Sequence, residues 1–232
     1  MKTLFLLHGA LGAEDQLYQL KVELKKQFRV QTINFSGHGG QPFATEFSIE
    51  QFADELIGAI EVLPADEKPV SVFGYSMGGY VATYAALLRP GLFDKIITLA
   101  TKWHWDEPTA MRECAMLNPE TIELKVPAFA QQLAQRHAPN NWKEVLQKTS
   151  AMLKAMGKTP PLDITKSGLP FTPALLLLGD SDKTVSLEET TFVFRLWPGA
   201  SLSVLPCTQH PLEKVDIDFL SQLIQWFLQP GK

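Results

Sequence analysis

Cysteine is scarce in this chain, which has only Cys114 and Cys207 among its 232 residues. Two thiols cannot form the disulfide framework that holds small secreted domains together. Their separation in the sequence also lacks the paired spacing of a structural metal site. We therefore expect two reduced thiols and no metal bound by them.

Long uninterrupted apolar runs are also absent. A short one opens the chain at residues 1–7, MKTLFLL, and resembles the start of a signal peptide. It is too short for that role, because His8 and Gly9 interrupt it and no cleavage site follows. No later segment has the length needed to cross a bilayer. We therefore expect a soluble, cytoplasmic protein with no membrane partner.

Charge of one sign is not concentrated anywhere in the sequence. The 21 Lys and Arg and the 25 Asp and Glu residues give a formal net charge of -4, without a basic cluster. Such clusters are what usually binds nucleic acids and anionic membranes, so we expect neither as a partner. The hydrophobic share of 45% is that of an ordinary globular enzyme. A chain of this length can bury one core, and we expect a single domain over residues 1–232.

Short apolar runs alternate with longer amphipathic segments along most of the chain. This alternation is typical of a parallel sheet whose strands are connected by helices. Most of the short runs are almost continuously apolar, as expected for strands covered on both faces. The pattern predicts an α/β fold with a doubly wound, mostly parallel six-stranded sheet. The expected strands are residues 4–7, 29–35, 70–75, 95–100, 174–178 and 201–205.

Helical patterns fill the segments between these strands. Leucines recur at helical spacing from residue 17 to 28, and a capping box at Ser48 to Gln51 predicts a helix that ends before Pro64. A third helix follows Ser76 and ends before Arg89, and the last one runs through residues 219–227.

The alternation breaks between Thr101 and Pro173. This stretch is too long for a simple connection and too regularly patterned for a disordered loop. Two helices are expected in it, at residues 129–136 and 142–156. We interpret residues 101–170 as a small helical cap inserted over one end of the sheet.

The strongest local signal is the segment GYSMGG at residues 74–79, which matches the nucleophile-elbow pattern G-x-S-x-G. It falls between an expected strand and an expected helix, where that motif belongs. Glycines near Ser76 permit the sharp turn, which would expose the serine hydroxyl above the sheet edge. A glycine-rich turn whose serine only caps the helix is the simpler alternative. The surrounding residues favour Ser76 as a nucleophile.

A serine needs a neighbouring base to take its proton. Among the histidines, His210 follows the last expected strand, so its loop lies at the same sheet edge as Ser76. It also comes after the serine, as the order Ser, Asp, His of this motif requires. His8 and His38 precede the serine, and His104 and His137 belong to the insertion. We therefore expect His210 to be the base.

Two carboxylates could orient this histidine. Asp180 and Asp182 both follow the expected strand at residues 174–178 and lie between Ser76 and His210 in the sequence. An orienting acid fixes the tautomer of the base and stabilises the imidazolium. Asp182 lies further along the loop and has more reach, while Asp180 can cap the local turn. The residues themselves leave both possible.

The negative oxygen of a tetrahedral intermediate needs two backbone N–H donors. One is the residue after the nucleophile, Met77, and the other comes from the loop after the first strand, HGALG at residues 8–12. We choose Ala10 as the second donor, with Leu11 as the alternative. A plain glycine turn would look the same in isolation.

The acyl pocket is expected to be formed by the insertion. Trp103, His104 and Trp105 leave the sheet at its carboxyl edge, where open α/β sheets bind ligands. We predict that these three residues, together with Leu11, contact the substrate. The alternative is that the tryptophans only pack the insertion onto the sheet.

Taken together, these features resemble the α/β-hydrolase superfamily, and within it the small bacterial carboxylesterases and the MenH-like group. The resemblance spans nearly the whole chain and includes the elbow, the His8-Gly9 turn and the segment SGHG at residues 36–39, similar to a family loop PGHG. The family's acid is usually the third residue after a glycine. The resemblance therefore implies Asp182, which is third after Gly179.

The sequence departs from the family in two places. Family members normally have a β-hairpin before the His-Gly strand, whereas this sequence starts at that strand. Relatives that catalyse the menaquinone-pathway elimination usually carry an arginine shortly after the elbow, where Tyr80 stands here. The resemblance thus implies an α/β-hydrolase fold lacking the N-terminal hairpin, and it disfavours the elimination.

We predict a serine hydrolase that cleaves a carboxylic ester or thioester of a small molecule through an acyl-enzyme. Ser76, Asp182 and His210 would form the triad, and this chemistry requires no cofactor and no metal. One alternative is a lyase or C–C bond hydrolase of the MenH-like type with the same triad. Another is a ligand receptor that retains the triad. Dehalogenation is disfavoured, because it needs an aspartate in place of Ser76.

Overall fold

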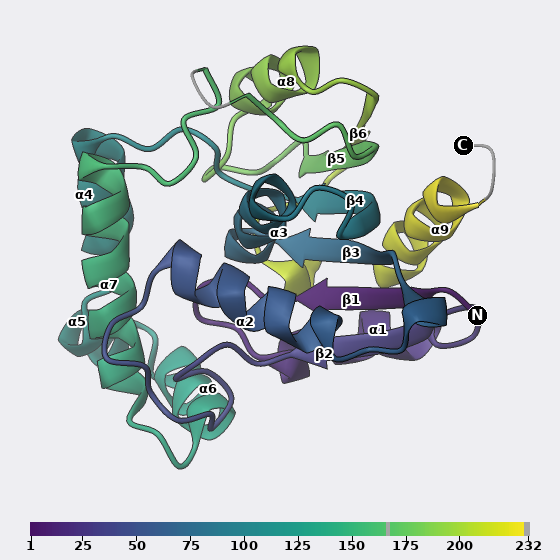
Figure 1. The fold of residues 1–232 in the computed structure, drawn as a ribbon. Helices are drawn as coiled ribbons and strands as arrows, with labels where there is room; N and C mark the ends of the chain where they lie inside the picture. The colour runs from purple at the N-terminus through teal and green to yellow at the C-terminus, as the bar shows by residue number, and fades with distance from the viewer. Residues whose placement is uncertain (166–167, 230–232) are drawn as a thin grey trace.

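The core of the molecule is a six-stranded sheet whose strands are all parallel, in the order β2-β1-β3-β4-β5-β6 (Figure 1). It is seen in a computed structural model that describes residues 1–165 and 168–229. The strands are β1 (Thr3–Leu7), β2 (Arg29–Ile33), β3 (Val70–Tyr75), β4 (Phe93–Leu99), β5 (Ala174–Gly179) and β6 (Ala200–Leu205).

Burial along the strands explains their nearly continuous apolar sequences. Every residue of β1, β3 and β5 is buried, whereas the edge strands β2 and β6 are mostly half-buried. Strands covered on both faces cannot keep an alternating polar face. The prediction of a doubly wound six-stranded sheet is therefore confirmed, and the sheet is wholly parallel.

Helices cover both faces of the sheet. α1 and α9 pack on one face through an apolar cluster that includes Leu20 and Ile224, while α2, α3 and α8 pack on the other through Phe52, Val81 and Val193. The helices of this framework are α1 (Tyr18–Leu24), α2 (Ile49–Glu61), α3 (Met77–Leu88), α8 (Leu187–Leu196) and α9 (Ile217–Leu228), with 3₁₀ turns η1 (Glu14–Leu17), η2 (Ala65–Glu67) and η3 (Leu212–Lys214).

A helical insertion lies between β4 and β5, beyond the carboxyl ends of the strands (Figure 1). It consists of α4 (Glu107–Ala115), α5 (Pro119–Lys125), α6 (Pro127–His137) and α7 (Trp142–Lys158). The sequence pattern predicted α6 and α7, whereas α4 and α5 were not predicted. Both missed helices begin at polar caps, where Asp106 accepts from Thr109 N–H at 2.7 Å and Asn118 from Thr121 N–H at 2.7 Å.

The observed strands agree with the expected ones to within two residues at each end. Residues 166–167 of the expected insertion and 230–232 of the expected domain lie outside the described residues. No helix in the described ranges is long and apolar enough to span a bilayer. The parallel arrangement brings the loops after β1, β3, β4, β5 and β6 to one edge of the sheet, and the candidate site lies there.

Candidate active site

Ser76 occupies a strained turn between β3 and α3, with φ 51° and ψ -115°. The residues two positions before and two positions after Ser76 must be glycines for the turn to close. A Cβ on Gly74 would lie 2.4 Å from the backbone of Gly78, and a Cβ on Gly78 would lie 2.7 Å from the carbonyl oxygen of Leu7. The Ser76 N–H donates to the Leu99 carbonyl at 2.8 Å, which ties the turn to β4. The sequence therefore builds a compact turn that exposes one serine.

The helix that follows starts at Met77, directly behind Ser76. Its first N–H groups and its dipole favour negative charge at this position. The close packing continues at Gly79, where a Cβ would lie 2.1 Å from Thr101 Oγ1. That hydroxyl donates to the Ser76 carbonyl at 3.1 Å. The end of β4 therefore supports the turn from the other side.

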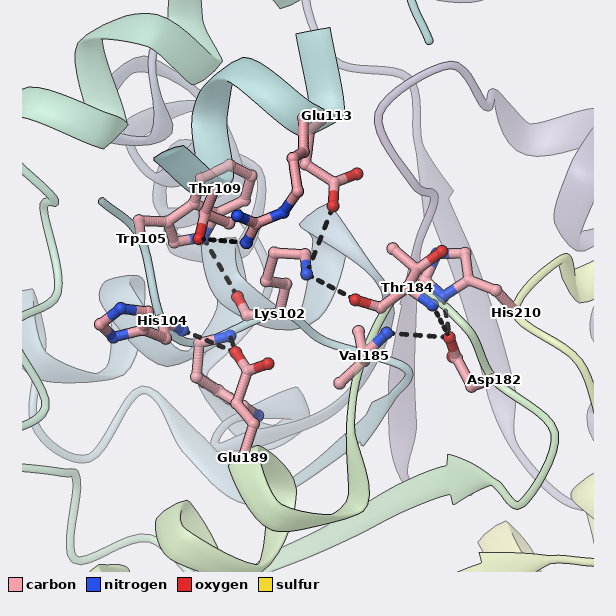
Figure 2. A network of polar contacts seen from close by, with 12 residues as sticks. Lys102, His104, Trp105, Thr109, Glu113, Asp182, Thr184, Val185, Glu189 and His210 are labelled. Carbon is pink, nitrogen blue, oxygen red and sulfur yellow. Dashed lines mark hydrogen bonds and ion pairs between the residues drawn. The ribbon is translucent and has the colours of Figure 1, made fainter. Parts of the chain in front are cut away.

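His210 is held by Asp182. The histidine Nδ1 and the carboxylate Oδ2 are 2.8 Å apart, and the Asp182 side chain is only 1% exposed. The other carboxylate oxygen accepts the N–H of Thr184 at 2.7 Å and of Val185 at 2.9 Å (Figure 2). An ionised carboxylate can only accept, so Nδ1 carries the proton and Nε2 is left as an acceptor.

The environment keeps Asp182 ionised. Burial on its own would raise the pKa of this carboxyl, but the hydrogen bond and charge of His210 and the two backbone N–H donors outweigh burial. The net effect is a pKa below the ordinary value. At neutral pH Asp182 is therefore a carboxylate.

Asp180 has a different environment on the same loop. Its oxygens accept the N–H of Cys207 at 2.9 Å, the N–H of Thr208 at 3.2 Å and the hydroxyl of Ser181 at 2.9 Å. The Cys207 N–H and the Ser181 hydroxyl are the main reasons why the pKa of Asp180 is lowered. Asp180 thus fastens the segment that leads to His210, while Asp182 contacts the histidine itself.

The loop after β1 is a tight turn in which the carbonyls of Gly9, Ala10 and Leu11 all have hydrogen-bond partners. The Gly9 carbonyl accepts the Gly12 N–H at 2.9 Å and the Nδ1–H of His8 at 2.8 Å. The Phe35 N–H donates to His8 Nε2 at 3.3 Å, which places the His8 proton on Nδ1. Because a trans peptide points its N–H opposite to its C=O, the Ala10 N–H faces away from these donors.

Ala10 and Leu11 are the central residues of this turn. The Ala10 carbonyl lies 2.7 Å from His38 Nε2, and the Leu11 carbonyl accepts from an Arg136 Nη at 3.1 Å. Among the described residues, no hydrogen bond uses the N–H of Ala10 or the N–H of Leu11. Both N–H groups expected as oxyanion donors are therefore free, and both residues line the same cavity as Ser76.

Three buried histidines lie beside this turn. The ring centroids of His8 and His38 are 5.0 Å apart, and those of His38 and His137 are 5.6 Å apart. Burial lowers the pKa of each, and His137, which is also close to His38 and Arg136, titrates at about 4. Within the described ranges, no group of three His, Cys, Asp or Glu side chains could hold a metal ion. The cluster is neutral at pH 7.

A cavity of about 580 Å³ joins the candidate residues. Ser76 and His210 both line it, together with Met77 and Ala10. Tyr75 links two of the loops, because its hydroxyl donates to the His210 carbonyl at 3.1 Å. The rest of the lining is largely apolar, and the insertion contributes many of the apolar side chains. These apolar residues include Trp105, Met116, Leu117, Phe129, Met152, Leu153 and Met156.

The four residues expected to contact substrate are distributed over two places. Leu11 and Trp105 line the cavity of Ser76. Trp103 is 2% exposed and packs against Tyr80 and Trp197. Trp103 and His104 line a neighbouring cavity of about 550 Å³, and Glu189 accepts both of their backbone N–H groups (Figure 2). Trp103 thus serves the packing of the insertion.

Lys102, which was not predicted from the sequence, lies in the wall of the cavity that contains Ser76. Its ammonium forms an ion pair with Glu113 of α4 at 3.3 Å and donates to the Thr184 carbonyl at 2.5 Å (Figure 2). The pair connects the insertion to the loop of Asp182. Its position directly after β4 was a usable signal, because that edge carries the site.

A serine at a strained strand-to-helix turn and a histidine–carboxylate pair at the same edge of a parallel sheet define the α/β-hydrolase class. A family model described as alpha/beta hydrolase fold matches residues 2–166. The chain therefore belongs to the α/β-hydrolase family.

Two curated relatives are similar to this chain over more than three quarters of its length. An sn-1-specific diacylglycerol lipase of Danio rerio is 25% identical over 98% of this chain and 78% of the relative. A pimeloyl-[acyl-carrier protein] methyl ester esterase of Aliivibrio salmonicida is 28% identical over 81% of this chain and 69% of the relative.

Solved structures share the fold. A thermophilic esterase from Thermogutta terrifontis superposes with a TM-score of 0.78 at 22% identity, over 98% of this chain and 89% of that one. MenH from S. aureus gives a TM-score of 0.74 at 19% identity, over 98% and 93%. Both are similar to this chain in architecture.

Proposed function

We propose that this chain is a carboxylic ester hydrolase that cleaves the ester or thioester of a small apolar acyl compound through an acyl-enzyme. One observation carries the proposal: Ser76, at a strained turn, and His210, held by the buried Asp182, open into one largely apolar cavity. The esterase and lipase names of the relatives support ester hydrolysis as the reaction class.

In the proposed reaction the Ser76 hydroxyl attacks the acyl carbonyl while His210 Nε2 takes its proton. The bond from the serine oxygen to the acyl carbon forms, and the bond to the leaving alcohol or thiol breaks as His210 returns the proton. A water molecule then releases the acid by the same two steps. Asp182 keeps the proton of the resting imidazole on Nδ1 and stabilises the imidazolium.

The oxygen that becomes negative needs donors that are already in place. The N–H of Met77, at the start of α3, is the first, and the N–H of Ala10 is the second. The held carbonyl of Gly9 supports this choice of Ala10, because it turns the Ala10 N–H away from the loop interior. Removing one such donor typically lowers the rate by about 10²–10³.

Two features of the cavity bear on the substrate. Its apolar wall, to which Leu11 and Trp105 contribute, suits a hydrocarbon acyl chain. Tyr80, which stands where elimination-type relatives are expected to have an arginine, is buried and exchanges hydrogen bonds with the backbone of Leu162. This position offers no cation, so we favour hydrolysis over a lyase reaction.

The test uses a serine-directed fluorophosphonate and a panel of p-nitrophenyl esters and acyl thioesters of increasing chain length. The probe should add its mass to the peptide with Ser76, and Ser76→Ala should remove ester hydrolysis. Ser181→Ala is the matched control, because Ser181 lines the same cavity and should be dispensable. Hydrolysis that survives Ser76→Ala, labelling of Ser181 instead, or products of elimination would contradict the proposal.

A further inference from the structure

Arg136 is a charged residue that is almost completely buried, with 3% of its side chain exposed. It lies in the last turn of α6. Its guanidinium reaches three segments far away in the sequence. The acceptors are the Asp15 carboxylate at 3.0 Å, the Leu11 carbonyl at 3.1 Å and the Glu213 carboxylate at 3.5 Å.

The planar guanidinium of arginine spreads its donors over three nitrogens and so reaches acceptors in three different directions, whereas the three donors of a lysine ammonium all lie on one atom. All three donor nitrogens of Arg136 are in use, and its charge faces two carboxylates. Although Arg136 lines the cavity of Ser76, these contacts make it a poor site for an anionic substrate group. Its contacts point instead to a role within the protein.

The first role concerns the turn formed by residues 9–12. The Leu11–Gly12 peptide is held at both ends, because the Gly12 N–H donates to the Gly9 carbonyl at 2.9 Å and the Leu11 carbonyl accepts from Arg136. This peptide closes the turn that contains Ala10 and Leu11. The contact of Arg136 therefore restrains the same turn that carries the Ala10 N–H, without touching that group.

The second role concerns the segment after His210. Glu213 lies in η3, three residues beyond the histidine, and also accepts from Gln16 Nε2 at 3.3 Å. Gln16 in turn accepts the Gly9 N–H at 3.3 Å. A polar network thus runs from Arg136 through Glu213 and Gln16 to the first residue of the turn. The turn and the segment after His210 share one anchor, and that anchor belongs to the insertion.

We propose that Arg136 is a positioning residue that couples the helical insertion to the oxyanion turn and to the His210 segment. The proposal rests on the proposed function, in which the Ala10 N–H stabilises the oxyanion. Displacement of α6 would then loosen the donor turn and the base segment together.

The experiment compares Arg136→Met and Arg136→Lys with Lys143→Met. Lys143 is the matched control, because it pairs with Glu123 at 2.7 Å inside the insertion and touches neither loop. With a short neutral p-nitrophenyl ester, Arg136→Met should lower kcat by about tenfold to a hundredfold with KM within about twofold. Arg136→Lys should recover part of the loss, and the control should match the wild type.

A second measurement does not depend on activity. Hydrogen exchange of the peptide covering residues 9–12 should be faster in Arg136→Met than in the wild type and unchanged in Lys143→Met. Asp15 and Glu213 are about half-exposed, so water can solvate them when the arginine is removed and the fold should persist.

Three results would overturn the proposal. A raised KM at unchanged kcat would make Arg136 a substrate contact. Unchanged exchange at residues 9–12 would show that the turn is held without it. A fall in kcat fully explained by a lower unfolding midpoint, with no partial recovery in Arg136→Lys, would make the residue merely structural. If the wild type does not hydrolyse esters, the proposed function is overturned instead. The hydrogen-exchange comparison of residues 9–12 would then still decide whether Arg136 couples the insertion to the turn.

Discussion

Single residues on the loop after β5 show how two neighbouring carboxylates acquire different tasks. Asp182 is buried and uses one oxygen for His210 and the other for two backbone N–H groups. Asp180 directs both oxygens to the segment that follows β6. The sequence alone left both residues possible, because both follow the same strand. The difference arises from the fold of the loop, which no local pattern records.

Exchanging each carboxylate for its amide should separate these tasks. Asp182→Asn keeps the shape but favours the wrong imidazole tautomer, so we expect kcat for ester hydrolysis to fall by orders of magnitude, up to the roughly 10⁴-fold seen for the same substitution in a serine protease. Asp180→Asn turns an NH2 group toward the backbone N–H of Cys207 or Thr208 and loses that one hydrogen bond. Neither group contacts His210, so kcat should change by less than about tenfold. Steady-state kinetics and far-ultraviolet circular dichroism check both. The opposite order of effects would assign the orienting role to Asp180.

At the scale of elements, the contact between α4 and α7 shapes the cavity. Gly157 of α7 allows the two helices to approach closely, because an added Cβ would lie 2.6 Å from the Cβ of Ala110 and 2.9 Å from the Asp106 carbonyl. Met152, Leu153 and Met156 of the same helix line the cavity. A shift of α4 against α7 therefore changes the space available to an acyl chain.

Two glycine-to-alanine substitutions in helices test whether the contact between α4 and α7 sets the space in the cavity. Gly58 lies in α2 with nothing within 4 Å of an added Cβ, so Gly58→Ala should raise the free energy of unfolding by about 0.5–1 kcal/mol and leave activity unchanged. Gly157→Ala should lower the free energy of unfolding by about 1–3 kcal/mol and alter the chain-length preference. Urea unfolding and the ester panel measure both effects. A stabilising Gly157→Ala with an unaltered preference would show that the helices can separate freely.

Elements differ in how far the sequence predicted them. The strands were found to within two residues, because burial on both faces leaves a continuous apolar run with glycine or proline nearby. Of the insertion helices, α6 and α7 were expected, whereas α4 and α5 are short and their polar caps at Asp106 and Asn118 were overlooked. The position of Lys102 after β4 was a signal for the site, but its contact with Thr184 and the three contacts of Arg136 could not be predicted, because these partners are distant in the sequence.

For the whole molecule, the cluster of His8, His38 and His137 links the sheet to the insertion. All three are fully buried, and burial holds the pKa of each below its ordinary value. The unfolded chain titrates its histidines near pH 6.5, so at lower pH it binds protons that the folded chain does not. The stability from these residues is complete above pH 6.5 and decreases as the pH falls toward their folded values.

Replacing His137 should make the free energy of unfolding less dependent on pH. The pKa of His137 is lowered to about 4 in the folded chain. Between pH 6.5 and 4, protonation of this histidine in the unfolded chain therefore lowers the free energy of unfolding by on the order of 3 kcal/mol. In His137→Asn the amide oxygen can still accept the Gly39 N–H. The free energy of unfolding of this variant should therefore decrease less between pH 6.5 and 4 than that of the wild type, by about the same amount. Urea titrations at several pH values measure it. His104→Asn, at a 69% exposed side chain, is the control and should follow the wild type.

The backbone angles of Ser76 carry a consequence for the history of such a chain. A φ of 51° with a ψ of -115° is a conformation that glycine adopts freely and that costs other residues on the order of 1–3 kcal/mol. Stability and the proposed reaction therefore make opposite demands at this position. A gene copy released from that reaction would gain heat resistance by exchanging the serine for glycine, so selection for stability alone would favour loss of the proposed nucleophile.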